Sequence, residues 1–417
     1  MGYGATAPDA GTTSTTGTTG TTGTLEDLAD FRPFLMPEIV KEPQPVYERL
    51  RAEAPVLETP VGVVLSRHED VMYALRHPEL FASDMDAVHL GNERPLIPLQ
   101  IDPPDHLRYR KILDPLFAPR EINRLDGEVR ALTNSLIDAF VDTGEVEYAS
   151  AVAVPLPCTV FLALMGLPQD ELAYFLSLKD GIIRPEGGFG TEECRDAQRA
   201  TGRAIYDYFD QAVADRRAHP RDDLITRFTV AEAEGDRLSD DEILDICFLF
   251  IMAGLDTVTA SLGCSMAYLA QHPEARAALV GDPGLVPGAV EELLRWEGVV
   301  PGSARMCAQD TEINGTPITK GTPVHVLIAS ANLDPQEFPD PEHVDFNRSG
   351  NRHLAFGGGV HRCLGSHLAR LELRVALEEW HRRIPEYAIA PGAAPGYITG
   401  LRAVETLPLV FPRGGKG

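Results

Sequence analysis

The sequence lacks paired cysteines, a long hydrophobic run and an excess of positive charge, and each absence excludes a class of protein. None of its six cysteines belongs to a C-x-x-C pair, which argues against a zinc ribbon or a disulfide framework and for a reducing compartment. The longest apolar run, residues 246–255, is about half the roughly 20 residues that a membrane span requires. The formal net charge of −25 argues against a broad nucleic-acid-binding face. We therefore expect a soluble, cytoplasmic protein with no nucleic-acid partner and no membrane anchor.

Most of the chain shows helical periodicity. Residues 11–24 are a Gly/Thr-rich tract without an apolar centre, so we expect a disordered tail over residues 1–24 and a single domain over residues 25–417. Short strands are predicted between about residues 299 and 328 and near 396–411, where β-branched residues alternate with Gly and Pro turns. The pattern predicts a mainly α protein with small β-sheets, an α+β fold.

The longest predicted helix covers residues 239–272. Ser239 is its expected N-cap, and acidic residues fill its first turn. At 1.5 Å per residue the helix would be near 50 Å long, so it would cross the whole protein. Earlier in the chain, residues 182–190 interrupt the helical pattern and have the Pro and Gly content of a mobile loop.

The segment HLAFGGGVHRCLG, residues 353–365, surrounds one cysteine with glycines and leads into a helical pattern. Cys363 is therefore expected at or just before a helix N-terminus, where backbone N–H groups and the helix dipole favour the thiolate and lower its pKa. The glycines would let a flat partner approach the backbone closely.

The cysteine segment alone leaves four interpretations open. Cys363 could be a structural thiol in a glycine-rich turn, or a nucleophile activated by a histidine base. It could also join His353, His361 and His367 in a zinc site, although the glycines would then have no purpose. The fourth interpretation is an axial thiolate ligand of haem iron.

Two further motifs bear on this choice. AGLDT, residues 253–257, places an acid and a hydroxyl in the middle of the long apolar helix. Taken alone, it could be a solvated face with a threonine bonded to its own backbone. EELLR, residues 291–295, contains a Glu-Arg pair at i, i+3, which taken alone is common on helix surfaces.

Together, the three motifs resemble those of a cytochrome P450, a haem-thiolate monooxygenase, of the soluble bacterial type. FGGGVHRCLG, residues 356–365, matches the family's F-G-x-G-x-H-x-C-x-G cysteine loop at every specified position. AGLDT matches the oxygen-activating groove of the family's long central helix, and EELLR supplies its E-x-x-R pair. The resemblance covers about residues 35–410 and implies a single P450-type domain with the long helix over haem b.

The resemblance assigns roles to individual residues. Cys363 would be the axial ligand of the haem iron, and Asp256 and Thr257 would relay protons to dioxygen beside Gly254, which would leave room for oxygen and substrate. A buried network would join Glu292, Arg295 and Arg348. The other residues expected to contact the haem or its propionates are His106, Arg110, Arg305, His361, Phe356, Gly357, Gly365 and Ala253.

Two expectations apply to the protein surface: where an electron donor docks, and how the chain departs from the family pattern. No flavin or iron–sulfur motif appears in the chain, so the resemblance implies a separate ferredoxin and ferredoxin reductase, with the enzyme a monomer. Arg108, Lys111 and Arg362 are candidates for donor docking, with plain surface solvation as the alternative. Where many relatives carry N-R-D-P, this chain has Leu333 in place of the arginine, which we expect to alter a surface salt bridge.

The implied reaction is the insertion of one atom of dioxygen into a hydrophobic small molecule such as a terpenoid, steroid-like, fatty or aromatic compound. The alternative is a haem-thiolate protein that acts without dioxygen, in ligand binding, isomerisation or dehydration. Residues 185–190 are expected to form part of a lid. Aliphatic side chains placed to line the substrate pocket are Met85, Val88, Leu99, Ile183, Leu249, Val299, Val300 and Ile398.

Overall fold

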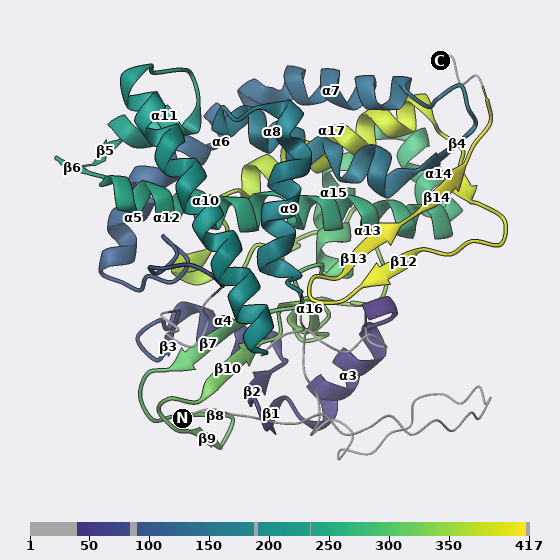
Figure 1. The fold of residues 1–417 in the computed structure, drawn as a ribbon. Coiled ribbons are helices and arrows are strands. Elements are labelled where there is room, and N and C mark those ends of the chain that lie inside the picture. Colours follow the sequence, from purple (N-terminus) through teal and green to yellow (C-terminus); the bar gives the residue numbers. More distant parts are fainter. Residues whose placement is uncertain (1–39, 84–89, 187–190, 234, 414–417) are drawn as a thin grey trace.

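A computed structural model describes residues 40–83, 90–186, 191–233 and 235–413 (Figure 1). The predicted tail over residues 1–24, the pocket candidates Met85 and Val88, and most of the expected lid lie outside the described residues. The predicted mainly α fold with small sheets is confirmed. The helices are α3 (Gln44–Glu53), α4 (His68–Arg76), α5 (Asp105–Leu113), α6 (Pro119–Ile122), α7 (Asp126–Asp138), α8 (Pro155–Met165), α9 (Leu172–Ile183), α10 (Glu192–Ala218), α11 (Leu224–Val230), α12 (Asp240–Gly254), α13 (Thr257–Gln271), α14 (Pro273–Gly281), α15 (Val286–Glu297), α16 (Ile328–Ala331) and α17 (Ser366–Arg383).

The largest sheet has the strand order β1-β2-β10-β7-β3 and lies to one side of the helices (Figure 1). Its only parallel pair among the described strands is β2 with β10. Its strands are β1 (Val56–Thr59), β2 (Gly62–Leu65), β10 (Pro323–Val326), β7 (Ser303–Cys307) and β3 (Phe81–Ala82). The smaller sheets pair β11 (Ala388–Ile389), β14 (Pro408–Val410) and β4 (Glu145–Glu147), then β12 (Gly396–Ile398) with β13 (Ala403–Thr406), β5 (Glu232–Ala233) with β6 (Asp236–Arg237), and β8 (Thr311–Ile313) with β9 (Thr316–Ile318).

The long central helix is interrupted, which corrects the prediction of one helix over residues 239–272. Ser239 and Glu242 form a capping box at its start, as their types predict. Helix α12 ends at Gly254 and α13 begins at Thr257, with Leu255 and Asp256 between them. Hydroxyls of threonines in this region bond to backbone carbonyls one turn back, which loosens the helical ladder and bends helices.

The helical run Asp240–Gln271 is long and apolar enough to span a membrane by length and composition alone. However, 61% of its most apolar window is buried inside the protein, as expected for the core helix of a globular domain. Helices α12 and α13 run end to end through the middle of the helical part (Figure 1).

Short elements flank the central helix on both sides. Helix α11 ends at Val230, and the β5–β6 hairpin follows it. Helix α14 is not predicted from the sequence, because only His272 separates it from α13 and the two helical patterns merge.

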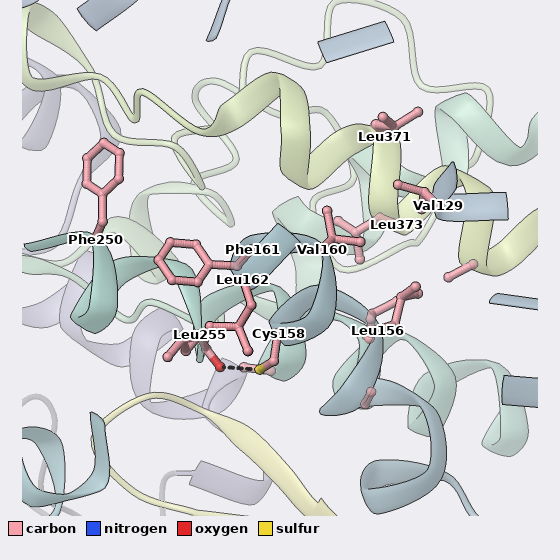
Figure 2. Close-up of a cluster of buried hydrophobic side chains, with 14 of the residues drawn as sticks. Val129, Leu156, Cys158, Val160, Phe161, Leu162, Phe250, Leu255, Leu371 and Leu373 are labelled. Carbon is pink, nitrogen blue, oxygen red and sulfur yellow. Dashed lines mark hydrogen bonds between the residues drawn. The ribbon is translucent and has the colours of Figure 1, made fainter. Parts of the chain in front are cut away.

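Part of the main hydrophobic core lies where α8 packs against α7, α12 and α13. Figure 2 shows part of this cluster and the hydrogen bond, 3.3 Å long, from the thiol of Cys158 to the carbonyl of Leu255 at the helix interruption. The core therefore fixes the position of the interruption. Buried members of the cluster include Val129, Leu156, Val160, Phe161, Leu162, Phe250, Leu371 and Leu373.

Candidate functional site

The cysteine loop is folded against α4 by its glycines. Gly357 and Gly359 have φ values of +68° and +64°, a region that side chains rarely adopt. A Cβ atom at Gly359 would lie 2.0 Å from the carbonyl oxygen of Leu75, the last but one residue of α4. The backbone N–H of Cys363 donates to the carbonyl of Phe356 at 2.8 Å. Helix α17 begins three residues after Cys363, with Gly365 at its N-cap.

Cys363 differs from the other cysteines, all of which are buried, because it is exposed. Burial nevertheless raises the pKa of its thiol, although the N–H of Gly365 and the guanidinium groups of Arg110, Arg362 and Arg370 act to lower it. The expected lowering of this pKa is therefore wrong for the protein alone, because desolvation outweighs the favourable neighbours. Cys363 is therefore exposed at the surface, with charged and backbone groups of the protein around its sulfur.

A cluster of cationic and imidazole side chains lies near this loop. His106, on α5, is fully buried, and within the described part of the chain neither of its ring nitrogens has a hydrogen-bond partner. Its ring centroid lies 4.3 Å from that of His361. Burial, followed by the charges of His361 and Arg110, lowers the pKa of His106 to about 4. Buried polar atoms are rarely left without a partner, so this histidine is placed to bind something else.

Arg305, on β7, is only 6% exposed, and burial lowers its pKa although the charge of Asp102 acts to raise it. Asp102 lies 3.4 Å from His361 Nε2. Arg305 Nη1 donates to the hydroxyl of Ser303 and the carbonyl of Ala304, both at 2.7 Å. Arg110 donates to the carbonyl of Arg362 at 2.7 Å and pairs with the exposed Asp114. Two imidazoles and two guanidinium groups beside an accessible thiol fit a flat group that carries carboxylates, such as haem with its propionates.

At the helix interruption, Asp256 is held by two cations. It is 4% exposed, and its two carboxylate oxygens accept hydrogen bonds from Lys179 Nζ at 3.1 Å and Arg184 Nη2 at 3.2 Å. Neither cation was expected from the sequence, in which Lys179 and Asp180 are adjacent charges within the otherwise apolar α9. Lys179 also pairs with Asp180 at 3.0 Å, and a lysine this deeply buried needs such partners.

Thr257 and Ala253 form the exposed side of the interruption. The hydroxyl of Thr257 donates to the carbonyl of Ala253 at 3.1 Å, and Ala253 is exposed although its neighbours on α12 are mostly buried. At Gly254 a Cβ atom would lie 2.6 Å from the ring of Phe161. Gly254 therefore permits close packing of α12 on α8, and Ala253 provides the accessible surface.

The E-x-x-R residues form a fully buried network, which rules out the surface-pair interpretation. Glu292 and Arg295 are both 0% exposed and are joined by two hydrogen bonds of 2.7 and 2.8 Å. Arg348 Nε donates to Glu292 at 3.0 Å, and so does the amide of Asn351. Arg295 also donates to the carbonyl of Asn332. The network therefore ties α15 to the irregular segment that precedes the cysteine loop.

Leu333 is not on the surface, which corrects the expectation of an altered surface salt bridge. It is 2% exposed and belongs to a small hydrophobic cluster with Tyr47, Leu50 and Val64. An aliphatic side chain suits this position because it joins α3 to the sheet through apolar contact.

The described pocket candidates do not all lie together. Leu249 and Val299 belong to the main core, and Val300 and Ile398 pack against it. Leu99 is 43% exposed, and Ile183 is half-buried outside that cluster. A surface groove of about 720 Å³ between α14, β11 and β14 includes none of the six.

The remaining candidates separate clearly. Arg108 bonds to Asp236 and Glu242, so its charge is already neutralised, whereas Lys111 and Arg362 are exposed. The zinc interpretation fails because both ring nitrogens of His353 are engaged within the protein. No group of three or more potential ligands surrounds a possible metal position within the described ranges.

The fold and these residues define a haem-thiolate oxygenase, and comparison with known proteins agrees. A family model described as Cytochrome P450 matches residues 189–281 and 284–381. The chain is 33% identical over 380 residues to a steroid C26-monooxygenase of Mycobacterium tuberculosis, covering 89% of this chain and 94% of that protein. Its structure is similar to the bacillaene polyketide synthase cytochrome P450 PksS of Bacillus subtilis 168, with a TM-score of 0.82, 31% identity and coverage of 91% and 99%. It is also similar to a Bacillus megaterium cytochrome P450 in complex with testosterone, with a TM-score of 0.84, 25% identity and coverage of 90% and 99%.

The chain belongs to the cytochrome P450 family. It is accordingly a monooxygenase, an oxidoreductase that uses haem b, dioxygen and electrons from external donors. The chain itself contains no flavin or iron–sulfur domain.

Proposed function

We propose that the protein inserts one atom of dioxygen into a hydrophobic small molecule at a haem whose iron is bound by the sulfur of Cys363. One observation carries this assignment: the accessible thiol lies in a glycine loop beside a buried His106 that lacks partners among the described residues. When bound, thiolate-ligated haem supplies the reduction of dioxygen and the insertion of oxygen into an unreactive bond.

His106, Arg110, Arg305 and His361 would hold the propionates of the haem. A charge-assisted hydrogen bond to a propionate would satisfy the protonated ring nitrogen of His106, and the propionate charge would add to that of Asp102 beside Arg305. Phe356, Gly357 and Gly365 would shape the loop against one face of the haem, and Ala253 would face it from α12. Glu292, Arg295 and Arg348 act at a distance by bracing the loop.

Asp256 and Thr257 would deliver protons at the interruption of the central helix. The carboxylate of Asp256 would take a proton from solvent, which reaches the partly exposed side chain of its partner Arg184, and pass it inward. The hydroxyl of Thr257 donates to a carbonyl, so its lone pairs remain able to accept a hydrogen bond from the side of the exposed Ala253.

The proposed substrate is a terpenoid, steroid-like, fatty or aromatic compound, bound near Leu249, Val299, Val300 and Ile398. The steroid C26-monooxygenase and the testosterone complex among the similar proteins favour a steroid-like skeleton within this class. We propose further that residues 25–417 form one domain of a cytoplasmic monomer that receives electrons from a ferredoxin and its reductase. Lys111 and Arg362, both exposed, remain the candidates for donor docking.

The test is to screen hydrophobic compounds for a change of iron spin state and to measure consumption of dioxygen and reductant with surrogate ferredoxin partners. Consumption that depends on the substrate and yields an oxygenated product is expected. Ligands that bind without any such consumption would instead favour a haem-thiolate protein that acts without dioxygen.

Thr257→Ala tests the proton role, and Thr259→Ala is its matched control. The hydroxyl of Thr259 makes the same type of bond to a carbonyl one turn back. We expect Thr257→Ala to retain haem while reductant is diverted to peroxide, and Thr259→Ala to keep its electrons coupled to product. Fully coupled turnover in Thr257→Ala would remove Thr257 from the mechanism.

A further inference from the structure

Three side chains form a bracket around the ring of Phe356 in the cysteine loop. Arg370, on α17, donates from Nε and Nη2 to the two carboxylate oxygens of Glu291, on α15, at 2.6 and 2.8 Å. His353, at the start of the loop, lies 3.0 Å from the same carboxylate through Nε2. Glu291 immediately precedes the buried Glu292 but takes no part in that network.

The hydrogen bonds settle the charge of each group in the bracket. The Nδ1 atom of His353 accepts the backbone N–H of Ala355 at 3.1 Å, so Nε2 carries the proton and the imidazole is neutral. Burial raises the pKa of Glu291, but the bonds from Arg370 and His353 outweigh it and bring the pKa to about 2. The bracket is therefore one guanidinium cation and one carboxylate anion in a fixed orientation.

The positive end of this pair points at the loop. The guanidinium carbon of Arg370 lies 4.3 Å from the ring centroid of Phe356, within the range of a cation–π contact. The carbonyl of Phe356 in turn accepts the N–H of Cys363.

We propose that Glu291 and His353 hold Arg370 over Phe356 so that its positive charge stabilises the anionic sulfur of Cys363. Arg370 is thus a positioning residue that sets the electron donation of the sulfur and the reduction potential of the iron. The inference rests on Cys363 being the iron ligand, as proposed above. Groups around a metal ligand commonly tune the metal in this way, through charge and hydrogen bonding.

The sign of the effect follows from electrostatics. Reduction adds an electron to the haem iron and its cysteine ligand, and a nearby positive charge favours the reduced form. Removing the charge of Arg370 should therefore make the reduction potential more negative. Removing the counter-charge of Glu291 should make it more positive, because the guanidinium then acts uncompensated.

The experiment is a spectroelectrochemical titration of the substrate-free holoprotein. Arg370→Gln removes the charge, and Arg370→Lys retains it. The matched control is Arg374→Gln, one turn further along α17, whose arginine pairs with Asp126 and Glu378. We expect Arg370→Gln to lower the equilibrium constant for reduction about threefold, equal to about 28 mV at 59 mV per decade. Arg370→Lys and Arg374→Gln should stay close to the wild type.

A second variant keeps the test valid if Arg370→Gln fails to retain haem. Glu291→Gln should shift the potential in the positive direction. If Arg370→Gln and Glu291→Gln both bind haem and both have the reduction potential of Arg374→Gln, the proposed effect of Arg370 on the iron is wrong. The same holds if only one of them binds haem and has that potential. Failure of the ligand assignment is distinguishable, because the wild type would then lack the red-shifted carbonmonoxy band of reduced thiolate haem.

Discussion

Two buried polar clusters in this protein have opposite hydrogen-bonding states. In the Glu292 network, both carboxylate oxygens accept several hydrogen bonds, and Arg295 is fully buried with every contact supplied by the chain. In the His106 cluster, both ring nitrogens of a fully buried histidine have no partner among the described residues. Glu292, Arg295 and His106 are each 0% exposed, so their own exposure cannot account for the difference.

The comparison separates groups that support the fold from groups that await a ligand. A buried charge is tolerated when the protein satisfies it, and removing one partner then leaves the other uncompensated. A buried donor left free carries a cost that only a bound group can offset. The Glu292 network accordingly braces the segment before the cysteine loop, and in the proposed function the propionates of the haem complete the His106 cluster.

The largest expected effect is on the satisfied network. Glu292→Leu should lower the free energy of unfolding by roughly 3–5 kcal/mol, because Arg295 and Arg348 would lose their buried counter-charge. Urea unfolding of the variant measures this loss. Glu53→Gln is the control, since its pair with Arg49 is partly exposed and worth less than about 1 kcal/mol. Equal stability of the two variants would show that the network is not structural.

A buried histidine with both nitrogens satisfied should give a smaller effect that depends on pH. His381 lies 2.7 Å from the carbonyl of Leu377 and 3.1 Å from the hydroxyl of Tyr387, and burial lowers its pKa to about 4. The unfolded chain takes up a proton at this histidine near pH 6.5, but the folded protein does so only near pH 4. The free energy of unfolding that His381 contributes is therefore fully present above about pH 6.5 and falls by about 3 kcal/mol as the pH drops towards 4. Between pH 6.5 and 4 the free energy of unfolding of His381→Gln should fall less than that of the wild type, as measured by urea unfolding at each pH. Parallel pH curves for the two proteins would contradict the prediction.

The smallest effect on stability is expected at the unsatisfied histidine. His106→Phe should change the unfolding free energy of the apoprotein by less than about 1 kcal/mol, because no hydrogen bond within the described chain is lost. Haem release should nevertheless accelerate about tenfold or more, because the variant loses the proposed hydrogen bond from His106 to a charged propionate. Transfer of haem to an acceptor protein measures the rate. A strongly destabilised apoprotein would show that His106 has a structural role.

The sequence predicted those features that depend on local pattern. The capping box at Ser239, the helical start after Cys363 and the strands between residues 299 and 328 follow from residue type and spacing. The helix interruption did not, because hydroxyl bonds of the threonines and the packing of Cys158 on Leu255 decide it.

Long-range partners could not be predicted from one sequence. Asp256 meets a lysine 77 residues earlier in the chain, and only tertiary packing brings them together. In the same way, the neighbour of Gly254 proved to be Phe161, and the position of Leu333 proved to be apolar and buried. Residue type identified which groups need partners, but the fold determined which partners they have.

The most direct test is the absorption spectrum of the reduced protein with carbon monoxide, recorded for the wild type, Cys363→Ala and Cys307→Ala. Cys307 is buried and is the control. The wild type and Cys307→Ala are expected to show the red-shifted band of thiolate-bound haem, and Cys363→Ala to lack it. A band that persists in Cys363→Ala, or a wild type without one, would contradict the assignment of the iron ligand.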